Sequence, residues 1–290
     1  MNTQKRRRAA RTRTLGLLAC AIALPTVLTL TGCRKGGMRS RLVAIQRTKM
    51  IEIDGPPVTR GRFTALDVEN QNGAVYIEAS DRISEATIEW RISKGNKTEI
   101  RSYGIDPSDG DSWVEAVHDA GPDRSILRVT TLNAPLESGF HPRVDLIIRT
   151  PVCDGLLVRN SGGDVEISGV RGAITVENGF AGGQGGRVEV RAVEPMVEPV
   201  RLTSSAGPVY LLVPPGSKGT LDIQSLEGRA EFNTTFGRVT HVHPTEKHWT
   251  GIWNEGENRI ELFSGKRDAR VLVVEHPRTR SIGPAFTLFD

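Results

Sequence analysis

The sequence predicts an all-β protein built as a β-solenoid, a stack of short strands joined by tight turns. Three observations favour this fold. A short pattern recurs along the chain, apolar residues alternate with polar ones on both sides of its turn, and 31 glycines accompany only 5% aromatic residues. Hydrophobic residues make up 38% of the 290 residues, which is enough to fill a core. This composition is typical of many strands and turns and argues against a helical bundle.

The recurring pattern is an apolar residue, any residue, Asn or Ser, two residues, Gly, any residue, Val or Ala, any residue and an apolar residue. Because its alternation has the two-residue period of a strand, each copy predicts a strand, a turn and a second strand. The glycine permits a positive φ, and the Asn or Ser can hydrogen-bond its own turn. The copies span Val68–Ile77, Val158–Ile167, Val176–Val190, Leu202–Leu211, Ile223–Phe232 and Ile252–Leu262.

The spacing of these copies suggests how they pack. Those that start at residues 158, 176, 202 and 223 lie 18, 26 and 21 residues apart, near the length of one solenoid coil. We expect neighbouring copies to stack their Val and Ile side chains into one continuous core, with capping segments over the strand edges at both ends. An antiparallel β-meander or sandwich is the alternative, because Asn72-Gly73 between alternating apolar residues is also a hairpin signal.

The first 33 residues have the order of a lipoprotein export signal. A basic segment precedes the apolar stretch Leu15–Leu30, which is short for a transmembrane helix. The tetrapeptide Leu30-Thr31-Gly32-Cys33 resembles the bacterial lipobox, and the resemblance implies cleavage before Cys33 and lipid attachment to its thiol. The basic residues are Lys5, Arg6, Arg7, Arg8, Arg11 and Arg13.

Four segments are therefore expected. Residues 1–32 form the signal peptide, 33–61 a lipid-anchored tether with a first strand, 62–276 the β-strand-repeat domain, and 277–290 a C-terminal tail or cap. Outside the repeats, alternation or an apolar run predicts further strands at Met50–Ile53, Ala86–Ile92, Ile126–Leu132, Val144–Ile148 and Val271–Val274.

The charge of the chain changes when the signal is removed. Residues 1–32 hold six basic residues and no acidic ones, so subtracting six from the formal net charge of +4 leaves −2. A protein that binds a polyanion needs a clustered basic face, which this balance does not provide. Nucleic acid is therefore excluded as an expected partner.

The three cysteines do not form a disulfide framework. Cys20 leaves with the signal and Cys33 is acylated, which leaves Cys153 as a free thiol. Cys153 lies at a turn between two apolar runs, and the sequence identifies no partner His that would activate it. We interpret it as a partly buried small hydrophobic residue.

The repeats resemble a bacterial putative-adhesin β-strand-repeat family, a domain of unknown function related to the head domains of putative autotransporter adhesins. The resemblance covers roughly residues 62–276 and implies a right-handed parallel β-helix in the cell envelope. It supplies no active site, so no catalytic residue is carried over. The insertion Phe180–Gly185 departs from the compact pattern. The segments that carry the resemblance are Leu66–Asn70 with Gly73–Val75, Val144–Ile148 through Pro151 and Leu157–Asn160 to Val188–Val190, and Val209–Ser217 with Leu221–Ile223.

Two groups of residues are weak candidates for metal ligands. His241, His243 and His248 form a dense imidazole cluster, since alternate residues of a strand face the same side, but Glu246 is the one acidic neighbour and an exposed loop is favoured. Asp106, Asp109 and Asp111 supply carboxylates in a turn, with a spacing unlike that of an EF-hand, and acidic turn residues are common without an ion. No cofactor is expected.

Two tryptophans and one insertion are candidates for binding. Trp249 and Trp253 could stack on a sugar ring, although a spacing of four is not expected to place them on one strand face, and a packed end-cap is favoured. The glycine-rich segment Gly179–Gly186 is interpreted as a mobile loop that could form a contact site.

The predicted function is that of a non-catalytic, lipid-anchored envelope protein whose solenoid face binds or scaffolds, adhesin-like or related to envelope stress. The expected partners are the membrane, through the lipid anchor, and an envelope protein or cell-wall glycan. Arg34 after the anchor favours the outer membrane if the cell is Gram-negative. The alternative is a polysaccharide lyase or hydrolase in a side groove, which rests on fold analogy. No catalytic motif is visible in the sequence.

Overall fold

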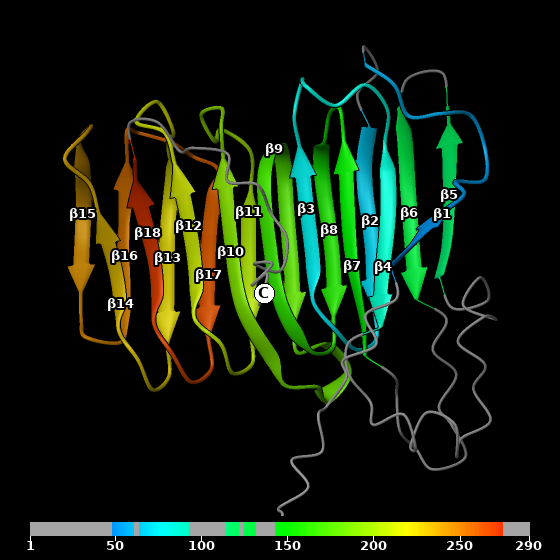
Figure 1. Cartoon of the computed structure of the whole chain (residues 1–290). Coiled ribbons are helices and arrows are strands. Elements are labelled where there is room, and N and C mark those ends of the chain that lie inside the picture. The colour runs from blue at the N-terminus through cyan, green and yellow to red at the C-terminus, as the bar shows by residue number, and fades with distance from the viewer. Residues whose placement is uncertain (1–47, 61–63, 93–113, 122–123, 132–142, 275–290) are drawn as a thin grey trace, which may run out of the picture. The chain divides into compact units, whose positions relative to one another are not determined.

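The computed structural model describes residues 48–60, 64–92, 114–121, 124–131 and 143–274 (Figure 1). The chain divides into residues 1–41, which lie outside the described residues, and a second unit, Leu42–Asp290. Cys33, the tail 277–290 and the acidic turn at residues 106–111 also fall outside the description. In the described part no helix is long and apolar enough to cross a membrane.

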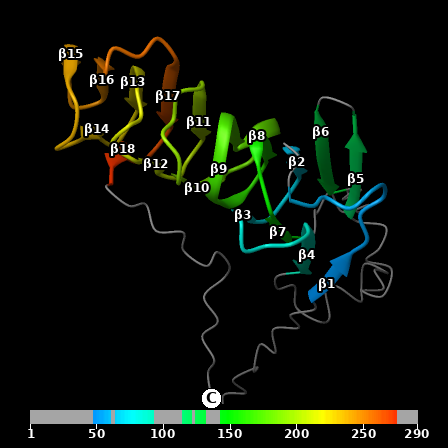
Figure 2. The same cartoon turned by 90° about the horizontal axis from the view of Figure 1, so that it is seen from above.

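The described residues form strands that lie in two layers, which we call sheet A and sheet B (Figure 2). Strand β9 (Gly163–Asn178) belongs to both, its first half to sheet A and its second half to sheet B. From one end to the other, sheet A contains β1 (Thr48–Ile51), β4 (Thr87–Ile92), β7 (Val144–Thr150), β3 (Val75–Ala79), β9, β10 (Gly185–Ala192), β12 (Val209–Val213), β18 (Ala269–Val273) and β14 (Ala230–Asn233).

Sheet B runs alongside, and the chain passes repeatedly from one sheet to the other. Its strands are, in spatial order, β5 (Val114–Ala120), β6 (Ser125–Thr131), β2 (Thr64–Asn70), β8 (Asp154–Asn160), β9, β11 (Val200–Ser204), β17 (Arg259–Ser264), β13 (Gly219–Ser225), β16 (His248–Trp253) and β15 (Val239–Pro244).

Most of these strand pairs are parallel, which confirms the predicted all-β class and its parallel pairing. In the described residues the antiparallel pairs are confined to the two ends, β1–β4, β4–β7 and β5–β6 at one and β13–β16 and β15–β16 at the other. The alternative prediction of antiparallel pairing therefore holds only at the two ends of the described strand stack. At the second end, β15 protects the exposed edge of sheet B with a backbone irregularity and with Pro244, two features that block further strand pairing.

The spatial order of the units differs from their order in the sequence. The pair β2 and β3 lies between β6 and β7 on one side and β8 and β9 on the other. The pair β17 and β18 likewise lies between β11 and β12 on one side and β13 and β14 on the other. Our expectation that neighbouring copies stack holds for Val68–Ile77 on Val158–Ile167. It is wrong between Leu202–Leu211 and Ile223–Phe232, because β17 and β18, from the end of the described chain, lie between these two copies.

Buried branched side chains stack in register and form one core. In sheet B, Val68, Val158 and Val176 are consecutive partners, and Leu202, Leu262 and Ile223 continue the row. In sheet A, Ile77, Ile167, Val190, Leu211 and Val271 do the same. All of them are at most 1% exposed. Burial of each side chain stabilises the fold by about 1.5–3 kcal/mol, and β-branched residues fit the pleated surface well.

One of the predicted repeat copies is displaced. The copy Ile252–Leu262 does not form a strand-turn-strand unit between the two sheets, because its turn joins β16 and β17 within sheet B. The unit that passes from sheet B to sheet A is Leu262–Val271, in which Ser264 takes the Asn/Ser position and Arg267 stands where the other copies have glycine. The sequence pattern did not predict this copy, because the pattern requires a glycine where Arg267 stands.

The Asn/Ser positions of the copies form a continuous buried row, the turn ladder. Ser204, Ser225 and Ser264 each accept a hydrogen bond from the N–H group three residues later, at 2.8–3.0 Å. The predicted bond of this residue to its own turn is therefore confirmed for the copies that contain Ser204 and Ser225. The asparagines also bond across units, since Asn160 Nδ2 donates to Asn178 Oδ1 at 3.0 Å. In spatial order the ladder is Thr131, Asn70, Asn160, Asn178, Ser204, Ser264 and Ser225.

The turn glycines allow adjacent turns to approach closely. Gly73 has a φ of +133°, and a Cβ on it would also lie 2.0 Å from the carbonyl oxygen of Val144. Gly207 needs no positive φ, but its Cβ would lie 2.0 Å from the carbonyl oxygen of Gly186 in the neighbouring turn. Both contacts involve backbone, which cannot rotate away.

We expect Gly207→Ala to destabilise the fold by about 1–3 kcal/mol, because the added methyl group must push two turns apart. Gly216→Ala is the matched control, since among the described residues its Cβ would meet only the Pro195 side chain, with Cγ at 3.1 Å and Cβ at 3.4 Å. Chemical denaturation monitored by circular dichroism measures both. Equal midpoints for the two variants would contradict close turn packing as the reason for Gly207.

Candidate functional site

The parallel register aligns outward-facing side chains into rows across sheet A. One row, which we call the Tyr76 row, takes one residue from each of six adjacent strands, about 4.8 Å apart. All its members are partly exposed. In spatial order they are Tyr76, Glu166, Glu189, Tyr210, Arg270 and Glu231.

Ion pairs hold the charged members of this row in place. Arg187 pairs with Glu166, and its Nη1 lies 3.3 Å from Glu189 Oε2. Arg270 pairs with Glu231 at 3.3 Å. Pairs as exposed as these contribute at most about 1 kcal/mol each to stability. Their main effect is to fix where charges and donors stand on the face.

Two tyrosines accompany the charges of the row, Tyr76 at its end and Tyr210 between Glu189 and Arg270. Tyr76 is half-buried, and burial, followed by the negative charges of Asp145 and Asp164, raises the pKa of its phenol above 10.0. The hydroxyl is therefore neutral at physiological pH and can both donate and accept a hydrogen bond. Aromatic rings with a polar edge are common in binding surfaces.

The predicted tryptophan pair lies inside the fold. Trp249 is 9% exposed and Trp253 fully buried, and both rings pack against Phe232 with centroids 5.0 and 5.3 Å away. The expectation about their spacing is wrong, because both belong to the single strand β16, where residues four apart share a face. They form a packed end-cap, and this burial leaves no open indole face for a sugar ring.

The histidine cluster is dispersed. His241 has a φ of +52°, and the register of β15 against β16 shifts between Thr240 and His243, so the simple alternation expected of a strand does not hold there. His248 Nε2 lies 2.9 Å from Asp222 Oδ1 on the neighbouring strand β13. Among the described residues no group of three His, Cys, Asp or Glu side chains could hold a metal ion.

The glycine-rich insertion is short and ordered by hydrogen bonds. Phe180–Gly182 form one 3₁₀ turn, and Phe180 is 37% exposed. The insertion contacts the next unit, because Gly185 N–H donates to Ser205 Oγ at 2.9 Å and Ser205 Oγ donates to the carbonyl of Gly183 at 3.1 Å. Its one exposed aromatic side chain gives it little binding surface.

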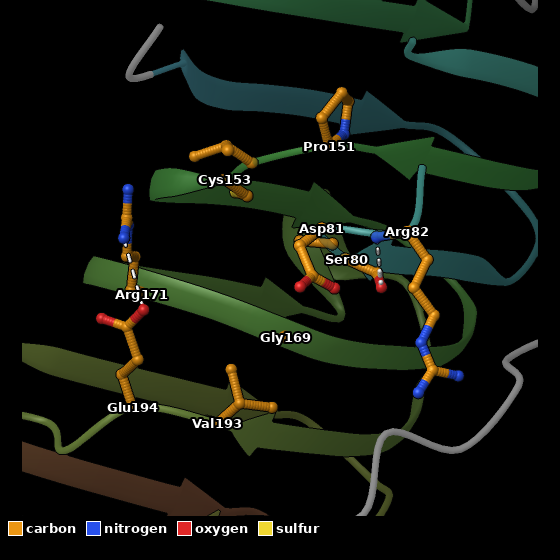
Figure 3. Close-up of a pocket in the computed structure, with 11 residues that line it drawn as sticks. Ser80, Asp81, Arg82, Pro151, Cys153, Gly169, Arg171, Val193 and Glu194 are labelled. Atoms are coloured by element: carbon orange, nitrogen blue, oxygen red, sulfur yellow. Dashed lines mark hydrogen bonds and ion pairs between the residues drawn. The ribbon is translucent and has the colours of Figure 1, made fainter. Parts of the chain in front are cut away.

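A pocket of about 380 Å³ lies where four adjacent strands of sheet A end (Figure 3). The strands β7, β3, β9 and β10 each contribute residues at or just beyond their carboxyl ends as members of this sheet. Charged side chains stand around it, and Arg171 Nη1 lies 3.3 Å from Glu194 Oε1. Sequence reasoning missed this pocket, because its residues come from turns that share no motif.

Cys153 borders this pocket but is only 1% exposed. Burial, with the charge of Asp154 as a smaller cause, raises the pKa of its thiol from 9.0 to about 12. A nucleophilic cysteine needs the opposite, a lowered pKa and access to solvent. The thiol therefore acts as the small apolar residue that the sequence suggested.

We expect the stability of the protein to fall as pH rises from about 9 towards 12, because the unfolded thiol ionises while the folded one keeps its proton. The slope from this group approaches about 1.4 kcal/mol per pH unit within that window. Denaturation at several pH values, in a chain whose other two cysteines are Ala, measures it. Cys153→Ala is expected to flatten the slope, and an unchanged slope would contradict the assignment.

The fold is similar to several solved structures of low sequence identity. A putative cell adhesion protein from Clostridium sporogenes matches 79% of this chain and 98% of its own, with 10% identity and a TM-score of 0.48. A putative adhesin from Bacteroides fragilis matches 78% and 97%, with 9% identity and a TM-score of 0.29. A putative lipid binding protein from Parabacteroides distasonis matches 78% and 97%, with 9% identity and a TM-score of 0.25.

Comparison of the sequence with known proteins assigns the chain to no family. No family model matches the chain, and no curated protein matches it either. At the identities and TM-scores above, the structural likenesses assign no ligand, partner or activity to this protein. Its function has to be argued from its own residues.

Proposed function

We propose that this protein is a non-catalytic, lipid-anchored component of the bacterial cell envelope, whose parallel stack is a right-handed β-solenoid that displays a binding or scaffolding face. The observation that carries the proposal is the Tyr76 row, in which six adjacent strands present one side chain each. Such a face offers fixed charges and hydroxyl groups at a regular spacing of about 4.8 Å. An adhesin-like role agrees with the family resemblance of the repeats.

The chemistry of the described residues favours binding over catalysis. The carboxylates that border the pocket, Asp81 and Glu194, are exposed, and Glu194 is paired with Arg171. The general acid of a glycosidase is instead kept protonated by an apolar setting. The exposed and paired carboxylates of the pocket therefore favour a binding role over lyase or hydrolase activity.

A pull-down from solubilised envelopes tests the binding face. The fragment 34–290 is compared with the variant Tyr76→Ala/Tyr210→Ala, and Arg201→Ala on the outer face of sheet B is the matched control. We expect an envelope protein or cell-wall glycan to be retained by the wild type and the control and lost from the double variant, with circular dichroism confirming that all three fold. Equal retention by all three, or by none, would overturn the proposed face.

The lipid anchor predicts a separate result. Replacing the thiol in Cys33→Ala removes the acylation site, so the protein is expected to leave the membrane fraction on carbonate extraction, since stable attachment requires acyl chains. Immunoblotting of both fractions measures this. Ser in place of Cys33 is the conservative control and should behave in the same way. Full retention of both variants would contradict the anchor and leave the binding face untouched.

A further inference from the structure

The pocket at the carboxyl ends of β7, β3, β9 and β10 combines small apolar lining residues with opposite charges at its rim (Figure 3). The apolar part is small and aliphatic, made by Ala79, Pro151, Val152 and Val193. No aromatic side chain among the described residues lines the pocket, so these residues offer no platform on which a sugar ring could stack. Its volume of about 380 Å³ is at the lower end for small-molecule sites.

The charges of the rim fall into two classes. Arg171 is committed to protein partners, with Glu194 at 3.3 Å and Asp154 at 3.9 Å. Asp81 and Arg82 are both exposed, and neither side chain has an ion pair with any part of the protein that the structure describes. The pocket therefore keeps one carboxylate and one guanidinium available for a ligand.

The backbone holds these two groups in a defined turn. Ile83 N–H donates to the carbonyl of Ser80 at 3.0 Å, and Ser80 N–H donates to the carbonyl of Thr150 at the end of β7. Arg82 N–H also donates to Ser80 Oγ, at 3.3 Å. Because the turn is tied both to itself and to the sheet, its backbone has little conformational entropy to lose when a ligand binds.

We propose that this pocket binds a short zwitterionic peptide with small aliphatic side chains. Arg82 receives the terminal carboxylate, for which the planar guanidinium offers paired donors. Asp81 receives the ammonium group, and the aliphatic side chains lie against Val152 and Val193. This site is distinct from the Tyr76 row, so it extends the proposed function without depending on the partner of that face.

Titration of the full chain in detergent with the dipeptide Ala-Ala, followed by isothermal calorimetry, tests the proposal. We expect saturable binding with a dissociation constant of about 1 mM. Arg82→Gln and Asp81→Asn should each weaken it by roughly tenfold, because each removes the protein's charge from a charge-assisted hydrogen bond to the ligand. A dipeptide with acetyl and amide caps should not bind.

Arg229→Gln is the matched control, since Arg229 is exposed and precedes β14 at the turn between sheets B and A, away from the pocket residues. Its affinity for Ala-Ala should equal that of the wild type. The inference is overturned if the wild type shows no saturation up to about 10 mM, if the capped dipeptide binds equally well, or if Arg82→Gln binds like Arg229→Gln. None of these outcomes bears on the pull-down result for the Tyr76 row.

Discussion

A chain that ends after residue 258 is expected to lose the fold of both sheets, although it lacks only β17, β18 and the residues C-terminal to them. In sheet B, β17 separates β11 from β13, and in sheet A, β18 separates β12 from β14. Removing the pair therefore opens a gap within the stack (Figure 1). A solenoid assembled in strict sequence order would lose only its last coil and keep the rest.

The energies involved are comparable to the whole stability of a domain. Ile260, Leu262 and Val271 are at most 1% exposed, and each contributes about 1.5–3 kcal/mol through burial. Their sum approaches the ~5–15 kcal/mol that keeps a typical protein folded. The lost strands also leave backbone groups of four neighbours without partners, which adds to the cost.

Limited proteolysis and urea denaturation of the truncated chain measure this effect. The control deletes the β15–β16 hairpin instead and joins residues 237 and 255 by about six Gly and Ser residues, a length that spans two strand spacings. That deletion removes slightly more strand residues than the truncation does. It takes them from the end of sheet B, however, so it opens no internal gap. We expect the hairpin variant to unfold cooperatively with a lower midpoint and the truncated chain to show no cooperative transition.

A synthetic peptide of residues 259–274 offers a second readout. If the truncated chain keeps part of the site between its neighbouring strands into which β17 and β18 fit, the added peptide should bind there. Binding should then restore protection from protease. A truncated chain that unfolds cooperatively with the midpoint of the full chain would contradict the inserted order of the units.

The strands could be predicted well from the sequence, because burying one face of a sheet makes apolar and polar residues alternate along each strand. The sequence also predicted the turns, since Asn or Ser followed by Gly three residues later describes a specific local geometry, seen at Asn70 and Gly73. The inserted order of β17 and β18 was not predictable in this way. Parallel strands pair through backbone hydrogen bonds, which do not depend on the side chains. The buried Val, Ile and Leu side chains of any two units also pack against each other about equally well, so neither interaction specifies which units are neighbours.

The candidate sites were harder to foresee than the fold. Whether Trp249 is exposed depends on Phe232, which reaches it from β14 in the other sheet. The pocket around Asp81 and Arg82 forms because the carboxyl ends of β3, β7, β9 and β10 meet in space, although the residues are more than one hundred positions apart at the extremes. The alternation of polar and apolar residues predicts which face of a sheet a residue occupies. It does not predict which strand ends lie side by side in the folded chain.

Asn178→Asp is expected to destabilise the fold by about 3–5 kcal/mol at neutral pH, the cost typical of an uncompensated buried charge. Asn178 is 3% exposed, and its Nδ2 donates to the carbonyls of Gly163 and Gly186 at 2.9 and 3.0 Å. A carboxylate has no hydrogen to donate, so two carbonyl oxygens would face a negative charge. Of the side-chain hydrogen bonds of Asn178 to described residues, only the one accepted from Asn160 Nδ2 would remain.

The sign of the pH dependence follows from the same contacts. Burial and the facing carbonyls disfavour the ionised form, so the introduced group has a higher pKa in the folded state than the ordinary 3.9 of an unfolded chain. The difference in stability from the wild type should therefore shrink as pH falls from that raised pKa towards 3.9, and stay constant below it. Guanidinium denaturation of both proteins at matched pH values measures the difference.

Two further variants separate a charge effect from loss of the ladder. Asn178→Ser should cost less than Asn178→Asp, because a hydroxyl can donate to one carbonyl, as Ser204 Oγ already does to Gly186 at 2.7 Å. Asn233→Asp, at the exposed end of β14, should change stability by less than about 0.5 kcal/mol. If Asn178→Asp behaved like Asn233→Asp at every pH, the turn ladder could not be a source of stability, and close turn packing and the apolar rows would have to hold the units in register by themselves.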